Sequence, residues 1–288
     1  MARTANIHSL PQAEPTISEA DFERFRDYFY KKTGIQFEDS KRYFVDKRLI
    51  ERIQATEHDS FRAYFTFMRF QASGDELQQL INRMTVNETY FFREEYQFKC
   101  MVGPVLEEIV RHKRRGEPVR IWSIPSSTGE EPFSIAIYLL EHWPAIDSVD
   151  VELLSSDIDS NVLKTCRRGR YSQRSIAQLP KPILKKWFTP QGGEYQLSND
   201  LLECVKFEQV NLSNPADTRK FRDIDLIFCR NLLIYFDDAS RRQAAETFYD
   251  ALGPGGFIFL GHSESMSRIS SLFRVRKFPD AIAYQKPT

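Results

Sequence analysis

Two consecutive glutamates, Glu130 and Glu131, follow a short apolar run and a turn of small residues. The run, residues 119–124, is rich in β-branched and aromatic side chains and predicts a buried strand, and Pro132 beside the acids predicts the start of a helix. Doubly wound α/β folds present a nucleotide at such a strand, turn and helix. The two acids would repel a phosphate but suit a cationic nucleoside with hydroxyl groups, such as S-adenosylmethionine. At this point the preference of acids for a helix N-terminus explains them equally well.

Further polar residues follow the other predicted strands of this half of the chain. Asp157-Ile-Asp159 comes after the strand at 151–156, where a carboxylate can accept hydrogen bonds from both ribose hydroxyls. Asn211 and Leu212 lie where a third loop would meet the same ligand, and the strand that begins at Asp225 leads into Arg230 and Asn231. Because the carboxyl ends of parallel strands share one edge of a sheet, we expect these residues to lie together.

The elements that must position them form a doubly wound α/β sheet over residues 119–288. Helices are predicted at 160–168 and 238–252, a fifth strand at 257–261, and an antiparallel hairpin from 273–275 and 281–284. The alternation of strands and helices is interrupted from about 169 to 207. Prolines, glycines and short alternating strands at 195–197 and 202–207 predict an inserted β-rich subdomain there.

The first part of the chain predicts a separate all-helical domain. Residues 1–15 are polar, contain two prolines and are expected to form a disordered tail. In the domain at 16–86, a capping box at Ser18–Asp21 and apolar residues at helical spacing predict four helices, at about 18–33, 40–57, 60–72 and 75–86. The basic pairs Lys41-Arg42 and Lys47-Arg48 indicate a solvated helix face rather than a docking surface for an acidic partner.

Residues 87–118 join the two parts as a linker segment and a helix that ends near Arg115. Polar side chains alternate with Tyr90, Phe91 and Phe92 at its start, which is unusual for a plain linker. We therefore expect this segment to cover a ligand, with Asn87 and Thr89 as hydrogen-bond partners and Arg93 as a binder of anions.

The composition excludes several classes of function. Forty basic and forty acidic residues give a formal net charge of zero, so no global field attracts nucleic acid or an anionic membrane. No apolar run forms a signal peptide or a membrane span, and the four cysteines and five histidines lack the spacing of metal ligands. We therefore expect a cytoplasmic, metal-free protein that does not insert into a membrane.

Two classes of enzyme are excluded by motifs. Gly261-His-Ser-Glu-Ser265 lacks the final glycine of a hydrolase nucleophile elbow, and no acid–histidine pair accompanies it. A nucleic-acid methyltransferase would carry a Pro-Cys nucleophile or an Asn/Asp-Pro-Pro-aromatic motif after the fourth strand, where this chain has Cys229-Arg-Asn-Leu232.

Five motifs, in this order and spacing, resemble the CheR-type chemotaxis receptor methyltransferases over about residues 16–285. They are Asn87-Glu-Thr-Tyr-Phe-Phe-Arg93, Ser127-Thr-Gly-Glu-Glu-Pro132, Ser156-Asp-Ile-Asp159, Phe228-Cys-Arg-Asn231 with Ile234-Tyr-Phe236, and Gly261-His-Ser-Glu264. The resemblance implies a helical N-terminal domain and a class I (Rossmann-like) methyltransferase domain with an inserted β-subdomain. It also implies methyl transfer from S-adenosyl-L-methionine to glutamate side chains on the cytoplasmic helices of methyl-accepting chemotaxis receptors, which a CheB-type methylesterase reverses.

The resemblance also assigns roles to residues. The cofactor-binding positions that it implies are Asn87, Thr89, Arg93, Glu131, Asp157, Asn211, Leu212, Arg230 and Asn231. Among them Asp157 matches the ribose contact. Arg93 and Tyr235 are implied to be catalytic, and we expect them to orient the incoming carboxylate. A glutamate side chain has a pKa of about 4.3 and is ionised at neutral pH, so the reaction needs no general base.

Two features depart from the family pattern. Ile124-Pro125 occupies positions where members usually carry small residues, and a proline lacks an N–H that could contact the cofactor. The loop around Gln191-Gly-Gly-Glu194 is shorter than in members whose β-subdomain binds a carboxy-terminal receptor pentapeptide. We therefore expect an enzyme that acts without this tether. We also expect a monomer. The alternative is a non-catalytic adaptor in which a methyltransferase fold binds cofactor or receptor.

Overall fold

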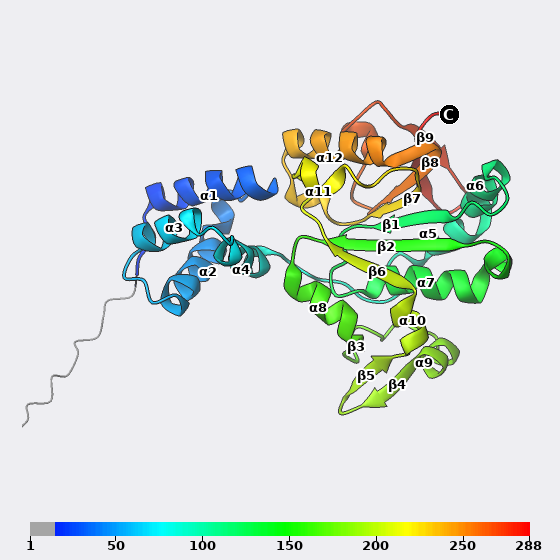
Figure 1. The fold of residues 1–288 in the computed structure, drawn as a ribbon, viewed down its shortest axis with the longest axis horizontal. Helices are drawn as coiled ribbons and strands as arrows, with labels where there is room; N and C mark the ends of the chain where they lie inside the picture. Colours follow the sequence, from blue (N-terminus) through cyan, green and yellow to red (C-terminus); the bar gives the residue numbers. More distant parts are fainter. Residues whose placement is uncertain (1–14) are drawn as a thin grey trace, which may run out of the picture. The chain divides into compact units, whose positions relative to one another are not determined.

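The computed structural model describes residues 15–288, which form two compact units (Figure 1). The first unit contains residues 15–28 and 37–84, and the second contains residues 29–36 and 85–288. The predicted tail, residues 1–15, lies outside the described residues except for Pro15.

The first unit is built from helices whose apolar faces pack together. They are α1 (Glu19–Thr33, whose last turn belongs to the second unit), α2 (Arg42–Ala55), α3 (Phe61–Phe70) and α4 (Asp75–Met84), with a 3-10 turn at Asp39–Lys41. The predicted capping box begins α1, because the Asp21 N–H donates to Ser18 Oγ at 3.2 Å and that hydroxyl donates to the Asp21 carboxylate at 2.6 Å. Aromatic side chains such as Phe22 and Phe25 are buried, which confirms the predicted all-helical unit.

The basic residues near the start of α2 are partly used inside this unit. The Arg42 guanidinium pairs with Asp46 at 3.4 Å, and Arg48 donates to the carbonyl oxygen of Arg83 at 2.6 Å while lying over the ring of Phe44. Arg42 and Arg48 are thus used within this unit, which the predicted solvated helix face did not include; Lys41 and Lys47 are exposed.

The second unit contains a seven-stranded sheet with the strand order β6-β2-β1-β7-β8-β10-β9. Its strands are β1 (Val119–Ser123), β2 (Val151–Asp157), β6 (Val205–Gln209), β7 (Ile224–Cys229), β8 (Leu252–Leu260), β9 (Arg274–Lys277) and β10 (Ile282–Gln285). The first five pair in parallel, and β10 pairs antiparallel with both β8 and β9. This topology confirms the predicted doubly wound α/β fold and its terminal hairpin.

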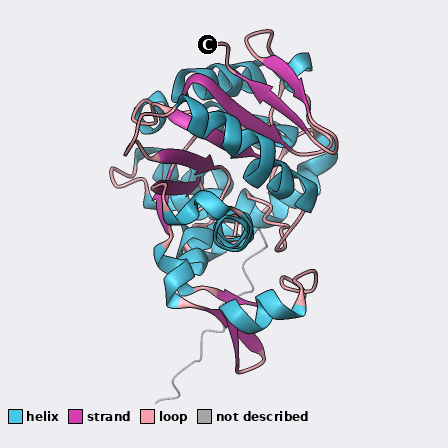
Figure 2. Ribbon diagram, turned by 90° about the vertical axis from the view of Figure 1, so that its right-hand side faces the viewer, coloured by secondary structure: helices cyan, strands magenta, loops and turns pink. Residues whose placement is uncertain are grey.

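Both faces of the central strands are buried, because successive side chains of these strands enter different cores. Figure 2 shows helices packed around the strands of the sheet. Ile121 of β1 packs with α5 (Glu95–Cys100), α6 (Leu106–His112) and α7 (Glu130–His142), whereas Trp122 packs with α12 (Asp238–Ala251). The smaller helix α8 (Ser160–Arg168) follows β2. Within the described residues, no helix has a long enough apolar stretch to cross a bilayer.

The helix predicted to end near Arg115 is interrupted. A π-helical turn at Met101–Val105 separates α5 from α6, and inside it Gly103 leaves helical geometry at φ −95° and ψ −115°. The next residue, Pro104, has no N–H to continue the helical hydrogen bonds, which explains the break.

The inserted subdomain forms a separate three-stranded sheet, seen at the bottom of Figure 1. It contains β3 (Arg170–Tyr171), α9 (Lys181–Trp187), β4 (Phe188–Gln191) and β5 (Glu194–Leu197) in the strand order β3-β5-β4. The strand predicted at 202–207 was misassigned. Residues 199–203 form α10 (Asn199–Glu203), and β6 joins the main sheet beside β2. Its alternating apolar residues fit either sheet, so pairing with β2 decides between them.

Candidate functional site

The loops after β1, β2, β6 and β7 bring the predicted site residues to one edge of the main sheet. The turn after β1 contains a cis peptide bond at Ile124-Pro125 and two residues with positive φ, Ser127 and Gly129. A Cβ on Gly129 would lie 2.7 Å from the Tyr171 hydroxyl and 3.2 Å from Cys166 Sγ, so this position requires glycine. The turn is therefore packed against both α8 and the β-subdomain.

The two glutamates after this turn have different partners. The Glu131 side chain is only 10% exposed, and its carboxylate accepts from Ser123 Oγ at 2.9 Å and pairs with Arg230 Nε at 2.8 Å. Burial raises the pKa of Glu131, and the Arg230 guanidinium opposes that shift. Glu130 is also buried but accepts from the hydroxyls of Thr128 and Ser175, and burial raises its pKa as well. Through the Ser175 hydroxyl, Glu130 thus connects the first turn of α7 with the β-subdomain.

Arg230 connects three segments of the site from inside the protein. Besides pairing with Glu131, its Nη2 donates to the carbonyl oxygen of Arg93 at 2.7 Å, and its guanidinium lies 5.2 Å from the Phe98 ring centroid. The residue is only 4% exposed. Arg230 therefore holds the loop after β7, the start of α7 and the linker segment together.

Asp157 lies at the end of β2 with both carboxylate oxygens directed at backbone N–H groups. It accepts from Ser127 N–H at 2.8 Å and from Asp159 N–H at 2.9 Å. Burial raises the pKa of Asp157 to about 7, although these hydrogen bonds favour the ionised form. Asp157 therefore links the loop after β2 to the turn after β1.

Sequence reasoning missed Asp159 as a site residue. One of its oxygens caps α8 by accepting from Asn161 N–H at 2.8 Å. The other accepts from Thr85 Oγ1 at 2.7 Å and from Asn87 Nδ2 at 3.2 Å, which brings the linker segment to this edge. The signal was available, since an aspartate directly before a predicted helix is a preferred N-cap.

Asn211 anchors a segment that sequence reasoning assigned to the helical domain. Its Nδ2 donates to the carbonyl oxygen of Lys32 at 2.6 Å. Ile35 forms an antiparallel bridge with Phe236, and Gln36 N–H donates to the carbonyl oxygen of Tyr235 at 3.2 Å. Residues 29–36 are therefore structural neighbours of the loops after β6 and β7. No local sequence pattern predicts such a long-range contact. Leu212, beside Asn211, is buried in the core.

Glu264 explains the fifth sequence motif. One of its carboxylate oxygens accepts from Gly261 N–H at 2.8 Å and from Asn231 N–H at 2.9 Å, which joins the loops after β8 and β7. Asn231 has a φ of +58°, and a Cβ on Gly261 would lie 2.9 Å from its side-chain nitrogen. The motif therefore has a structural role in holding the loop that carries Tyr235.

Tyr235 and Arg93 are two polar residues of this region that remain partly exposed. Tyr235 is 37% exposed, and burial of the remainder raises its pKa while Arg93 lowers it. The hydroxyl is thus protonated at neutral pH and can donate a hydrogen bond. Arg93 is half-buried, donates to the Glu88 carbonyl oxygen at 3.0 Å, and acts electrostatically on both Tyr235 and Glu131. Thr89 lies half-buried in the same linker segment.

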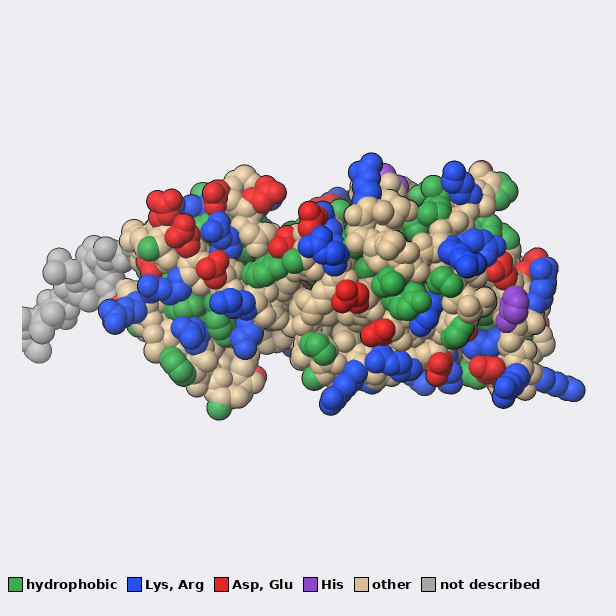
Figure 3. Space-filling view, turned by 90° about the horizontal axis from the view of Figure 1, so that it is seen from above, with side chains coloured by type: hydrophobic (Ala, Val, Ile, Leu, Met, Phe, Trp, Pro, Cys, Tyr) green, Lys and Arg blue, Asp and Glu red, His purple; other side chains and the backbone are tan. Residues whose placement is uncertain are grey.

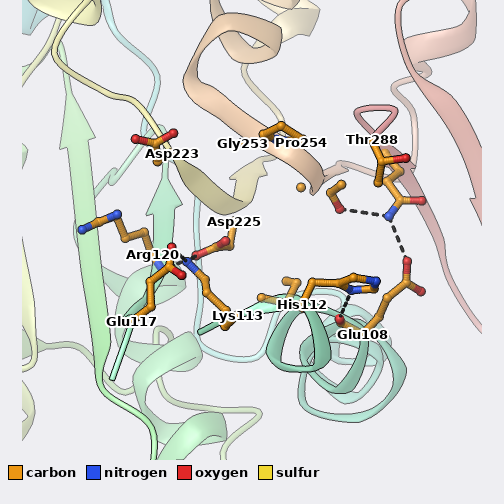
Figure 4. Close-up of a pocket in the computed structure, with 14 residues that line it drawn as sticks. Glu108, His112, Lys113, Glu117, Arg120, Asp223, Asp225, Gly253, Pro254 and Thr288 are labelled. Atoms are coloured by element: carbon orange, nitrogen blue, oxygen red, sulfur yellow. Dashed lines mark hydrogen bonds and ion pairs between the residues drawn. The ribbon is translucent and has the colours of Figure 1, made fainter. Parts of the chain in front are cut away.

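The chemistry of this edge fits a nucleoside with hydroxyl groups. Ser127 Oγ, in the turn beside Asp157, is buried and has no hydrogen-bond partner in the described part of the chain. Such a group is usually satisfied by water or a ligand. A hollow lies at the amino edge of the sheet, where Lys113 pairs with Asp225 at 2.7 Å and Gln285 donates to Glu108 at 2.9 Å (Figure 4). It is lined by residues at the amino ends of β1, β7 and β8, opposite the edge that carries the predicted site residues.

The sheet topology and this edge define a class I S-adenosylmethionine-dependent methyltransferase. A family model described as "CheR methyltransferase, SAM binding domain" matches residues 87–282, and one described as "CheR methyltransferase, all-alpha domain" matches residues 20–85. The chain is 58% identical to "Chemotaxis protein methyltransferase 2" of Vibrio cholerae, with 95% of each chain covered. It is 38% identical to the protein of that name from Pseudomonas aeruginosa, covering 88% of this chain and 89% of the relative. It is 35% identical to "Chemotaxis protein methyltransferase" of Salmonella typhimurium, covering 90% and 88%.

The chain therefore belongs to the CheR methyltransferase family, as the five motifs predicted. It is a methyltransferase, and S-adenosylmethionine is its methyl donor.

Replacing Arg230 by methionine leaves the Glu131 carboxylate buried without its cation. We expect this change to lower the free energy of unfolding by about 3–5 kcal/mol. Adding Glu131→Gln to the same chain should restore part of the loss, because neither buried charge then remains. All three tryptophans, Trp122, Trp143 and Trp187, lie in the second unit, so their fluorescence during urea unfolding reports on it. Equal unfolding curves for wild type and Arg230→Met would contradict a structural role for the pair.

Proposed function

We propose that this enzyme transfers the methyl group of S-adenosylmethionine to glutamate side chains of chemotaxis receptors and so forms methyl esters. The observation that carries the proposal is that the protonated Tyr235 hydroxyl and the Arg93 cation, which influence each other electrostatically, both remain partly exposed, while Glu131 is neutralised by Arg230. The names of the curated relatives support a substrate in chemotaxis. A cation and a hydroxyl donor suit an anionic carboxylate as the methyl acceptor.

The residues at this edge need only bind and orient the acceptor. S-adenosylmethionine supplies a methyl group on a positively charged sulfur. A glutamate carboxylate is ionised at neutral pH, so no side chain has to remove a proton from it. We infer that Arg93 and Tyr235 align the carboxylate and that exclusion of water from it contributes to the rate.

We propose that Asp157 and Ser127 hold the nucleoside. Asp157 would accept from the ribose hydroxyls, and the buried Ser127 hydroxyl would gain the partner that it lacks. We propose that Asn87, Asn211 and Arg230 act mainly by positioning segments around the cofactor, because their side chains hold other parts of the chain. We propose that the remaining cofactor-binding positions are Thr89, Glu131, Leu212 and Asn231.

Methyl transfer to a receptor distinguishes this function from the adaptor alternative. With tritium-labelled S-adenosylmethionine and receptor-containing membranes, the label should enter the receptor and be released as methanol by base, since an ester is base-labile and an N-methyl group is not. Tyr235→Phe should lower kcat by roughly 10- to 100-fold through misalignment of the acceptor. Tyr249→Phe, on α12, is the matched control. Base-stable label would refute the ester, and receptor binding without transfer would favour an adaptor.

Cofactor binding should depend on the ionisation of Asp157. Its pKa of about 7 lies above its ordinary value, so the carboxylate is mostly protonated at pH 6 and mostly ionised at pH 8. Only the ionised form can accept from both ribose hydroxyls, so affinity for S-adenosylhomocysteine should increase by about tenfold from pH 6 to pH 8. Calorimetry on Asp157→Asn should give weaker binding and a flat pH profile, whereas Asp250→Asn should match wild type. An unchanged profile in Asp157→Asn would remove Asp157 from the ribose assignment.

We propose that the enzyme does not depend on a receptor pentapeptide. An added strand would need N–H donors on a free sheet edge. Along β4 the N–H groups point alternately toward β5 and away from it. Those that point away, at the outer edge of the sheet, belong to residues 188 and 190. Phe188 N–H already donates to Leu184, and Pro190 has no N–H. On the opposite side, β3 is only two residues long.

Titration of a carboxy-terminal receptor pentapeptide into the enzyme should therefore give no calorimetric signal at micromolar concentrations. Removing the receptor's last residues should leave its methylation rate unchanged. Micromolar peptide binding that is lost on changing residues of β4 would contradict this proposal.

A further inference from the structure

Charge is distributed unevenly along the second unit. Residues 160–193 contain eight basic side chains and no acidic one, in a chain whose forty basic residues are balanced by forty acids. On the face drawn in Figure 3, by contrast, basic and acidic side chains are interspersed over the second unit. The acid-free segment comprises α8, β3, α9 and β4 and the loops between them. This segment therefore carries a local excess of positive charge in a protein without net charge.

Three of these cations form what we call the basic stripe: Lys164, Arg168 and Arg170. All three are exposed. Lys164 and Arg168 are four residues apart on α8 and share one helix face. Gln196 connects Arg168 with Arg170. Its Nε2 donates to the Arg168 carbonyl oxygen at 3.0 Å, and its Oε1 accepts from Arg170 Nε at 3.3 Å.

Two other cations of the acid-free segment have anionic partners, whereas the basic stripe has none within the described chain. Arg174 pairs with Glu88 at 3.1 Å, and Lys186 pairs with Glu141 at 2.6 Å. No carboxylate between residues 15 and 288 lies within ion-pair distance of the basic stripe, whose polar contacts are with neutral groups. Three exposed cations are thus available to a carboxylate on another molecule.

The basic stripe starts close to the candidate site. Helix α8 is capped by Asp159, the same residue that binds Thr85 and, in the linker segment, Asn87. Lys164 lies about one turn from that cap, and the nine residues of α8 extend about 13 Å from it. A helical segment with one side chain in the site could therefore run along the stripe.

We propose that the basic stripe docks the acidic receptor segment that carries the target glutamates. This inference rests on the proposed function, because a segment that presents glutamates for methylation carries carboxylates beside the one that reacts. Complementary charges at the rim of an interface raise the rate of association and select partners. Each methyl ester removes one negative charge, so the stripe favours receptors that are less methylated over those already modified.

The test is charge reversal in the full-length enzyme, measured with a soluble receptor fragment. The variant Lys164→Glu/Arg168→Glu/Arg170→Glu should raise KM for the fragment by about tenfold or more, with kcat and the Kd for S-adenosylhomocysteine unchanged. The control Arg242→Glu/Arg274→Glu/Lys277→Glu changes the net charge equally at three exposed residues and should leave KM within about twofold. Unchanged product binding in both variants shows that each has folded.

Binding of two forms of the fragment tests the selection directly. Wild type should bind the fragment with its methylatable glutamates more tightly than one in which they are replaced by glutamine, and the stripe variant should lose this preference. An unchanged KM and a retained preference in the stripe variant would overturn the proposal. The proposal would also be overturned if the stripe variant lost only its binding to anionic phosphatidylglycerol vesicles. That result would assign the basic stripe to a lipid surface. Absence of methyl transfer by wild type would instead contradict the proposed function.

Discussion

The buried ion pair between Arg230 and Glu131 is the interaction on which the site depends. Two opposite charges removed from water must satisfy each other, and here each is also bound by a further group, Ser123 for the acid and the Arg93 carbonyl for the base. Because the partners come from the loop after β7, the first turn of α7 and the linker segment, their pairing fixes three separate pieces of chain at one edge of the sheet. The linker is fastened a second time by Asp159, through Thr85 and Asn87.

This internal pairing determines which polar groups remain for ligands. Glu130 and Glu131 are used within the protein, and Glu264 supports the backbone of the loop that carries Tyr235. Asp157 is buried with an elevated pKa, and the Ser127 hydroxyl beside it lacks a partner among the described residues. Arg93 and Tyr235 lie at the open side. Such an arrangement suits a nucleophile that arrives already ionised, because the site then needs alignment and desolvation rather than a base.

The sequence predicted the elements better than their contacts. Hydrophobic periodicity and helix caps located the longer helices and the parallel strands to within a few residues, because those signals are local. The short helices α9 and α10 lie where only short strands were expected. The strand at 205–209 was assigned to the wrong sheet, since its alternation fits either one, and the helix after residue 94 was expected to pass through Gly103 and Pro104. The motifs identified Glu131, Asp157 and Arg230 as site residues, but not that Glu131 and Arg230 pair with each other. Nor could they indicate that Asn211 holds residues 29–36, because such a contact depends on the folded chain.

A crystal structure of the enzyme with S-adenosylhomocysteine would show which residues hold the ribose. We expect the ribose hydroxyls to lie within hydrogen-bond distance of the Asp157 carboxylate while Glu131 remains paired with Arg230. The sulfur atom should face the side of the site where Arg93 and Tyr235 are exposed. A ribose held by other residues, or a Glu131 side chain turned away from Arg230 to contact the ligand, would contradict this expectation.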